Sequence, residues 1–482
     1  MRNTTLADEL GYAAASLADA TRNLLSPAVR LGVTGLSGAG KTVFITALVH
    51  DLLNGASMPL FEPARAGRIH DVHLEPQPDV HVPRFAYEEH LAALTAGEDR
   101  HWPESTKQLS QLRLTLRYET TRTRLPWSER MRTLHLDIVD YPGEWLPDLP
   151  LLDLEYEEWS AAQLKRLSSL AAEEGEKDPF LERIAGLDSA APWREEEALA
   201  LARAYRERLQ ALKRKGGHYD LLQPGRFLMP GDLADSPMLT FAPLPAPDNG
   251  ASRTSLHGEM KHRYQAYVSR IVRPFFFEHF ARIDVQVVLV DVLSAINTGP
   301  RAILQLQEAL THILECFRIG PSRLFARRAE RILFAATRAD LVHHTQHERL
   351  RRILAWLVER AARKAGHAGA EVATLALAAI RATREGEMEH AGETLPVIIG
   401  VPEAGEKLGD QTFDGRTETA VFPGDLPEHP EDLLKEETRP SLRFPRFRPP
   451  LIPRPVPLEP APSFPFIRLD EALQFLLGER LS

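Results

Sequence analysis

The sequence predicts a three-layer α/β fold, in which helices cover both faces of a mostly parallel sheet, with a large helical insertion and a Pro-rich C-terminal tail. Three observations lead to this prediction. A short apolar run at 29–33 enters a glycine-rich loop and then a helical pattern. A nearly continuous apolar run at 285–293 has the composition of a strand buried on both faces of a parallel sheet, and 331–336 is the next predicted strand. Residues 151–280 are charge-rich and mostly helical in period.

The composition excludes several classes of protein. The 482 residues are 43% hydrophobic and 26% charged, which is ordinary for a globular protein with a large core. A net charge of −9 argues against a general nucleic-acid binder, so no nucleic-acid partner is expected. The single cysteine, Cys316, excludes an internal disulfide and is compatible with a cytoplasmic location. No apolar run approaches the roughly 20 residues that a membrane-spanning helix needs.

Changes in composition divide the chain into five parts. Residues 1–28 predict an amphipathic N-terminal helix, and packing against the body is favoured over membrane contact because its polar face lacks a Lys/Arg cluster. Residues 29–150 and 281–402 are expected to form the two parts of the core. The helical insertion at 151–280 is where recognition of a protein partner is expected. Residues 403–482 form a C-terminal extension that ends in a helix.

The loop after the first strand has the strongest motif. Residues Gly35–Thr42, Gly-Leu-Ser-Gly-Ala-Gly-Lys-Thr, match the P-loop spacing G-x-x-x-x-G-K-[ST] between a strand and a helix. Such a loop directs backbone N–H groups and a helix N-terminus at phosphates, while Lys41 adds charge and the Thr42 hydroxyl can ligate Mg²⁺. A chance match is disfavoured by the complete motif and its context. The predicted nucleotide contacts here are Gly35, Ser37, Gly38, Ala39, Gly40, Lys41, Thr42 and Val43.

A second motif follows a predicted antiparallel strand pair. Residues 112–118 and 133–140 alternate apolar and polar side chains, and the second run ends in Asp140-Tyr-Pro-Gly143. An acid at this position holds Mg²⁺ through water in P-loop proteins, and a following D-x-x-G glycine donates its N–H to the γ-phosphate. A D-x-P-G turn alone is a weak signal. Its place after the strand favours a role for Asp140 in metal binding and for Gly143 in nucleotide binding.

A third motif indicates base recognition. The strand at 331–336 leads into Thr337-Arg338-Ala-Asp340, which matches the [NT]-[KR]-x-D pattern that selects guanine in many GTPases. The Asp340 carboxylate can accept from both guanine N1–H and the 2-amino group, and the Arg338 stem would lie over the base. A helix N-cap at Asp340 is the alternative if the motif is taken alone. Ala382 and Thr383 are assigned to the last base-contact loop by position only.

Three histidines, His343, His344 and His347, follow the third motif at once. A metal site is one interpretation of this group. An exposed helix start is favoured, because no cysteine lies nearby and the spacing matches no zinc signature.

The order of these motifs, together with the late Phe-Arg-Pro-Pro at 447–450, resembles the YcjX-like family of bacterial P-loop NTPases over nearly the whole chain. The resemblance implies a Ras-like G domain interrupted by a large helical insertion. It also implies a nucleotide hydrolase linked to bacterial stress responses, with GTP or GDP and Mg²⁺ as ligands. Carried over by residue, it assigns phosphate binding to 35–42, Mg²⁺ and γ-phosphate roles to Asp140 and Gly143, and base recognition to Thr337 and Asp340.

Two catalytic assignments are less direct. Glu144 stands where many GTPases have the Gln that orients the attacking water. A glutamate there could act as a base, or could be a poor donor that leaves hydrolysis slow without a partner. Thr106 precedes the strand at 112–118, where a switch threonine would reach Mg²⁺ and the γ-phosphate, although a surface-loop threonine is the alternative. No catalytic arginine can be named.

The leading functional hypothesis is therefore a GTPase that transfers a phosphoryl group to water, with Lys41, Glu144 and Thr106 as catalytic residues. Thr42, Thr106 and Asp140 are the expected Mg²⁺ ligands. The alternatives are an ATPase of the same fold and a nucleotide-dependent binding switch with negligible turnover.

Overall fold

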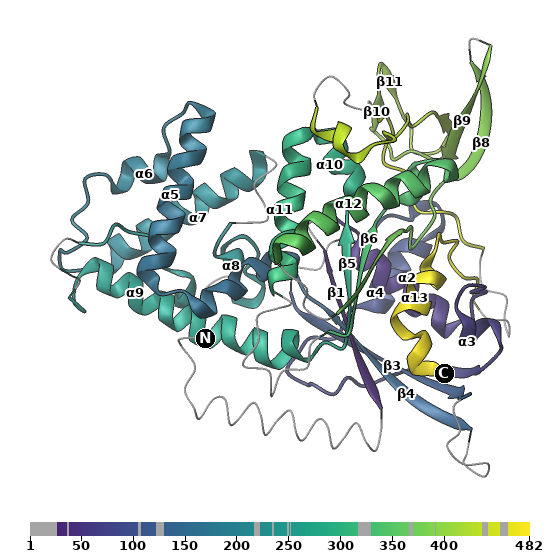
Figure 1. Ribbon diagram of the computed structural model, residues 1–482, viewed down its shortest axis with the longest axis horizontal. Coiled ribbons are helices and arrows are strands. Elements are labelled where there is room, and N and C mark those ends of the chain that lie inside the picture. The colour runs from purple at the N-terminus through teal and green to yellow at the C-terminus, as the bar shows by residue number, and fades with distance from the viewer. Residues whose placement is uncertain are drawn as a thin grey trace. The chain divides into compact units, whose positions relative to one another are not determined.

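The computed structural model describes most of the chain, and the described residues form two compact units (Figure 1). The sheet unit has its described residues within 27–143, 283–311 and 329–482, and the helical unit within 144–282 and 312–316. The expected N-terminal helix at 1–28 lies almost entirely outside the described residues. The ranges described are 27–35, 38–104, 108–121, 130–215, 222–233, 236–247, 250, 252–316, 329–365, 370–390, 392–435, 442–453 and 461–482.

The sheet unit is built on a seven-stranded sheet in the order β2-β3-β4-β1-β5-β6-β7. Strands β4, β1, β5, β6 and β7 are parallel to one another, while β2–β3 and β3–β4 are antiparallel. The predicted α/β class and the predicted antiparallel pair, β3 and β4, are thereby confirmed. The strands are β1 Ala28–Gly35, β2 Ile69–Glu75, β3 Ser110–Glu119, β4 Met131–Asp140, β5 Val285–Val290, β6 Arg331–Ala336 and β7 Glu371–Ala376.

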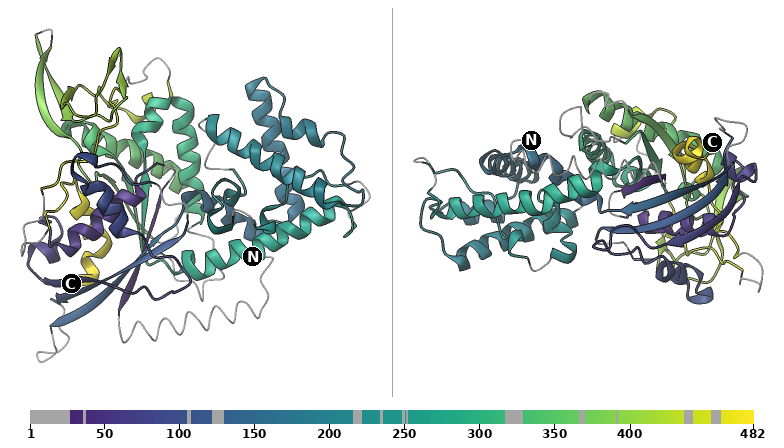
Figure 2. Two further views of the ribbon diagram at one scale, coloured as in Figure 1. Left: turned by 180° about the vertical axis from the view of Figure 1, so that it is seen from behind. Right: turned by 90° about the horizontal axis from the view of Figure 1, so that it is seen from below.

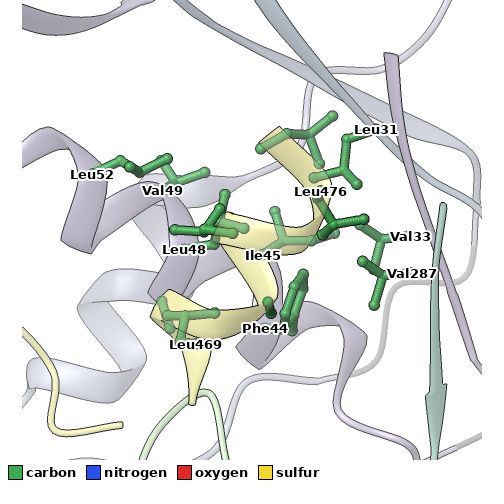
Figure 3. Close-up of a cluster of buried hydrophobic side chains, with 14 of the residues drawn as sticks. Leu31, Val33, Phe44, Ile45, Leu48, Val49, Leu52, Val287, Leu469 and Leu476 are labelled. Carbon is green, nitrogen blue, oxygen red and sulfur yellow. The ribbon is translucent and has the colours of Figure 1, made fainter. Parts of the chain in front are cut away.

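One face of this sheet is covered by α2 (Lys41–Leu53) and by α13 (Leu469–Leu477), with α4 (Tyr87–Thr95) beside them. Figure 3 shows side chains of α2 and α13 meeting those of β1 and β5, including Ile45, Leu476 and Val33. Helix α12 (His347–Ala365) packs on β6 and β7 with side chains outside this cluster. Since alternate residues of a strand face opposite sides, α12 covers the other face.

The structure differs from the predicted elements in two places. The composition of residues 55–110 predicts a loop-rich span, but the structure forms α3 (Glu62–Arg65), β2, α4 and a short turn, η1 (Gly97–Asp99), there. Strand β2 was missed because it is an edge strand with several exposed side chains, so its hydrophobic alternation is weak. The run at 285–293 forms a strand only to Val290, because Asp291 caps α10 (Val292–Thr298) by accepting from Ser294 N–H. A second helix, α11 (Pro300–Cys316), follows after Gly299.

The rest of the sheet unit carries two small antiparallel sheets. The apolar run at 395–401 predicts a strand, which the structure forms as β9 (Glu393–Gly400). This strand pairs with β8 (Arg384–His390) and β12 (Thr419–Val421) and not with the main sheet. Strands β10 (Lys407–Leu408) and β11 (Gln411–Thr412) form a hairpin. The short helical turns are η9 Ala339–Leu341, η10 His344–Gln346, η11 Pro430–Leu434 and η13 Gly478–Leu481.

The helical unit has its own aromatic core. Trp159 stacks on Tyr264 at 5.1 Å between ring centroids and meets Phe241 edge-on at 5.4 Å. Figure 2 shows the long helices of this unit, α5, α7 and α9, from two further sides. No helix among the described residues is both long and apolar enough to span a bilayer. The elements are η2 Gly143–Asp153, α5 Tyr156–Glu174, α6 Pro179–Ile184, α7 Glu195–Lys215, α8 Gly225–Leu228, η4 Gly231–Leu233, η5 Pro237–Leu239, α9 Leu256–Tyr267, η6 Val268–Val272, η7 Phe275–His279 and η8 Phe280–Arg282.

Candidate functional site

The loop between β1 and α2 has the backbone of an anion-binding turn. Gly38 and Gly40 adopt positive φ angles of 79° and 87°, and Gly40 is the N-cap of α2. A side chain at Gly40 would meet nothing within 4 Å, so the left-handed conformation, and not lack of space, requires glycine there. The unpaired N–H groups at the start of α2 and the positive end of its dipole therefore lie beside the loop. Ser37, a predicted contact, lies outside the described residues.

Lys41 and Thr42 begin the helix at this point. The Lys41 ammonium donates to the carbonyl of Gly35 at 3.2 Å, which holds the charge over the loop. The Thr42 hydroxyl lies 3.4 Å from the carbonyl oxygen of Glu104. The segment that precedes the predicted switch threonine thus reaches the start of α2, while Thr106 itself lies outside the described residues.

Asp140 and Gly143 lie next to the first glycine of the loop. Asp140 is the last residue of β4 and is paired in register with Val33 of β1, two residues before Gly35. Its side chain is buried. A Cβ atom at Gly143 would lie 2.5 Å from the carbonyl oxygen of Gly35, so only glycine permits this close approach. The two motifs predicted to contact the phosphates and Mg²⁺ are therefore adjacent in the sheet unit.

The turn after β6 is tied to the glycine-rich loop between β1 and α2. Arg338 has a φ of 59°, which is unusual for a residue other than glycine, and its guanidinium bonds the Gly38 carbonyl and the Asp291 carboxylate, each at 3.1 Å. Burial raises the pKa of Asp291, while the charge of Arg338 opposes that shift. Thr337 donates through its N–H to Val290 O at 2.9 Å. Arg338 thus joins three loops at the ends of parallel strands, in addition to the base-covering role predicted for its stem.

Asp340 bonds to the segment between β7 and β8. Its carboxylate accepts from the Ala382 N–H at 2.9 Å, and its carbonyl accepts from the Thr383 hydroxyl. Asp340 lies within the turn η9, whose N-cap position is occupied by Arg338, so the Asp340 carboxylate does not cap this turn. Burial raises the pKa of Asp340 to about 6. The assignment of Ala382 and Thr383, made by position, coincides with the residues that contact Asp340.

These loops line one pocket of about 660 Å³. The pocket has an adequate volume for a ligand of nucleotide size. Gly35, Asp140, Gly143 and Thr383 are not among the residues that line it. The predicted site residues that line it are Gly38, Ala39, Gly40, Lys41, Thr42, Val43, Thr337, Arg338, Asp340 and Ala382.

A further wall of the pocket comes from two segments for which the sequence predicts no role in the site. The Trp102 indole N–H donates to the Phe447 carbonyl at 2.7 Å, and Arg100 Nε donates to the Pro449 carbonyl at 2.6 Å. Arg448 in turn donates to Gly415 O at 2.7 Å. These bonds fasten the segment 446–449 against 100–103, and both segments line the pocket. The aromatic and Arg residues spaced through the Pro-rich tail were the available signal.

The charges around the pocket suit a polyanion. Lys41 and four arginines (100, 338, 446 and 448) line it, against two carboxylates, Asp340 and Glu403. An excess of fixed cations at a helix N-terminus attracts and retains phosphate groups.

Glu144 belongs to the helical unit, in which its carboxylate pairs with a lysine. Lys213 Nζ of α7 lies 3.2 Å from Glu144 Oε1, and both side chains are largely buried. The segment that follows Glu144 is fixed in the same unit, because the Trp145 indole donates to the Met229 carbonyl at 3.0 Å. The predicted water-orienting group is thus held by an ion pair, and Lys213 is a partner that no motif indicated.

Comparison with known proteins gives two results. The sequence profile of the YcjX-like family, DUF463, matches residues 29–481. The chain is 37% identical to a protein named Ras-like GTPase YcjX from Escherichia coli (strain K12) over 468 residues, which is 94% of this chain and 96% of that protein. It is also 37% identical to the protein of the same name from Shewanella oneidensis over 479 residues, 94% of each chain.

Proposed function

This chain belongs to the YcjX-like family, and we propose that it is a GTP-binding protein that hydrolyses GTP to GDP and phosphate. One observation carries the proposal. The phosphate-type loop with Lys41 and the guanine-type acceptor Asp340 line the same 660 Å³ pocket, although about 300 residues separate them in sequence. The name Ras-like GTPase of two relatives supports the choice of GTP.

In this proposal the loop 35–43 holds the phosphates through backbone N–H groups and Lys41. The hydroxyl of Thr42 and the carboxylate of Asp140, with Thr106 as a third candidate, form the oxygen donor set that Mg²⁺ prefers. Bound Mg²⁺ would neutralise charge on the outer phosphates. Gly143 N–H would donate to the γ-phosphate, and Glu144 would orient the attacking water. Catalysis would then rest on positioning and charge stabilisation.

In this proposal the base of the nucleotide is selected by five residues, Asp340, Thr337, Arg338, Ala382 and Thr383. A buried carboxylate facing guanine accepts from two donors, whereas opposite adenine it meets the N1 acceptor. A buried unpaired charge costs several kcal/mol, and about 1.4 kcal/mol is tenfold in affinity, so guanine should be preferred by roughly two orders of magnitude.

The test is competition of GTP, ATP and XTP for the wild type, for Asp340→Asn and for a control, Asp71→Asn, in an exposed acid of β2. Asp340→Asn should weaken GTP binding and shift preference toward the xanthine nucleotide, whose 2-oxo group accepts where guanine donates. The control should match the wild type. If the wild type prefers ATP, or if Asp340→Asn leaves the order of nucleotide affinities unchanged, the result would favour an ATPase of the same fold.

The Glu144–Lys213 ion pair supports a second candidate, a nucleotide-dependent binding switch with slow turnover. While the Glu144 carboxylate is paired with Lys213, it is a poor hydrogen-bond acceptor for the attacking water. We propose 29–150 and 281–402 as the nucleotide domain, 151–280 as the insertion available to a protein partner, and 403–482 as an extension whose Pro-rich part closes the pocket. The single cysteine supports a cytoplasmic location, and the family resemblance supports a link to bacterial stress responses.

A further inference from the structure

We propose that His343, His344 and Glu385 of the sheet unit bind one divalent transition-metal ion, with Zn²⁺ as the best-fitting ion. The site is separate from the predicted Mg²⁺ ligands, and the proposal does not rest on nucleotide binding. His343 and His344 belong to the turn that precedes α12, and Glu385 is the second residue of β8.

The three side chains already converge. One ligand atom from each, all within 4.8 Å of one another, can be chosen for a single ion. His344 Nδ1 lies 2.6 Å from Glu385 Oε2, and His343 Nε2 lies 3.8 Å from the same oxygen. Tetrahedral ligands at about 2.1 Å from zinc are about 3.4 Å apart, so small adjustments of these side chains would suffice.

Secondary contacts orient the ligands for this role. The Nδ1 atom of His343 lies 3.0 Å from the Thr345 hydroxyl, which leaves Nε2 directed at Glu385. Glu385 Oε1 accepts from the backbone N–H of His344 at 3.0 Å, so Oε2 is the oxygen that faces both rings. Such outer partners fix the tautomer and direction of metal-binding imidazoles.

The exposed fractions of the three side chains suit a site that a metal ion can enter from solvent. The His343 and Glu385 side chains are 12% and 24% exposed, whereas the His344 side chain is 63% exposed. Two ligands are therefore held by packing, and the third opens to solvent, where an ion and a water ligand can enter.

The donor set selects the class of ion. Two imidazoles with one carboxylate favour Zn²⁺ and other first-row transition ions over Mg²⁺ and Ca²⁺, which prefer oxygen ligands. Arg381 is the opposing group, with Nη2 at 3.5 Å from Glu385 Oε1. Arg381 therefore contacts Oε1, whereas the proposed ligand oxygen is Oε2. A simple His344–Glu385 hydrogen bond is the alternative account, and the experiment separates the two.

The site would have a structural consequence. The histidines follow the Thr337–Leu341 turn, and Glu385 follows Ala382 and Thr383. An ion held by both segments would cross-link the two loops that Asp340 already joins by a hydrogen bond. Metal binding to the folded state alone should therefore raise the thermal stability of the protein.

The test is calorimetric titration of Zn²⁺ into the metal-free, nucleotide-free full chain in excess Mg²⁺, with wild type, His344→Ala, Glu385→Gln and a control, His81→Ala. His81 is an exposed histidine of the same unit. We expect one equivalent of bound Zn²⁺ and a Zn²⁺-dependent rise in Tm for wild type and control. Each ligand substitution should lower the affinity by about 10- to 100-fold or more and remove the rise in Tm.

His344→Ala is the decisive variant, because its side chain is mostly exposed and the fold should tolerate its loss. Circular dichroism without metal checks that each variant is folded. Absence of stoichiometric Zn²⁺ binding to the wild type, or equal binding by folded His344→Ala, would overturn the proposal and leave an ordinary hydrogen-bonded pair.

Discussion

The carboxylate of Asp340 accepts a hydrogen bond from the backbone N–H of Ala382 at 2.9 Å, which joins the turn after β6 to the segment before β8. Burial raises the pKa of this carboxyl group to about 6, and Arg338 and Arg381 are the nearby charges that oppose the shift. The state of charge of Asp340 therefore changes within an accessible range of pH.

The first prediction concerns the pH dependence of GDP binding. Only the ionised carboxylate accepts from both guanine donors, so binding should favour the charged form and lower its pKa. The affinity for GDP should be constant at pH 7–8 and fall below about pH 6, approaching tenfold per pH unit once Asp340 is protonated. Fluorescence titration between pH 5 and 8 measures this. Asp340→Asn should lose the dependence, and a wild-type affinity independent of pH would contradict the assignment.

The second prediction concerns Lys41. Its ammonium is held over the glycine-rich loop by the Gly35 carbonyl, so Lys41→Ala should remove the proposed phosphate binding without disturbing the core. We expect a loss of GTP and GDP affinity of at least about 100-fold, because charge-assisted bonds to phosphate are worth several kcal/mol in total. Titration of both nucleotides is the measurement. Lys407→Ala, in an exposed lysine of β10, is the control, and equal affinities for the two variants would exclude the loop as a phosphate site.

The third prediction concerns Lys213 and Glu144. If the ion pair restrains a water-orienting carboxylate, Lys213→Ala should raise single-turnover GTP hydrolysis, and Glu144→Ala should lower it with little change in binding. The double variant should resemble Glu144→Ala. Arg214→Ala, in the exposed neighbour of Lys213 on α7, serves as the control. Equal rates for wild type, Lys213→Ala and Glu144→Ala would assign the attacking water to another group.

The fourth prediction concerns the buried acid of the helical unit, Asp148. It accepts from Gly225 N–H at 2.8 Å, from Arg226 N–H at 3.4 Å and from the Tyr267 hydroxyl. Burial raises the pKa of Asp148 to about 6. The stability that the protonated carboxyl group contributes is therefore lost as the pH rises from about 4 through 6. The three hydrogen-bond donors limit that loss, because they stabilise the charged form.

Tyr267→Phe should therefore lower the free energy of unfolding by roughly 2–3 kcal/mol at pH 8, where the hydroxyl serves a charged acceptor, and by about 1 kcal/mol at pH 5. Urea denaturation at both values measures the difference. Tyr264→Phe is a matched control, because its hydroxyl donates to a neutral carbonyl, Leu154 O, at 3.0 Å. Its cost should be the same at both pH values, and a similar invariance in Tyr267→Phe would contradict the charge of Asp148.

Local sequence patterns were sufficient to predict the strands and helices that carry the motifs. Strand β1, the glycine-rich loop and α2 follow one another in the chain, and β6 matches its predicted bounds, Arg331–Ala336. Their hydrophobic period and glycine positions are properties of short segments. Strand β2 was missed because its neighbour on one side is solvent, which leaves little apolar patterning to detect.

The rest of the site depends on contacts between distant residues. Trp102 bonds to Phe447, and Glu144 pairs with Lys213, at separations that no periodicity encodes. The same holds for Asp340. Its sequence permitted a helix cap or a ligand acceptor, and only the fold brings its carboxylate to Ala382. The chemistry of each residue was predictable, but its partner was not.

The position of helix α13 late in the sequence affects how the protein folds during its synthesis. It packs on α2 and the sheet, and its residues Asp470 and Gln474 accept from the N–H groups of Leu60 and Glu62, across 410 and 412 residues. At about 5–20 residues per second, translation separates the two partners by roughly 20–80 s. During that interval the apolar side of α2 has no cover from α13. The apolar side of α2 can therefore be covered only after α13 has been synthesised, and the pocket, which residues 446–449 also line, is completed late in translation.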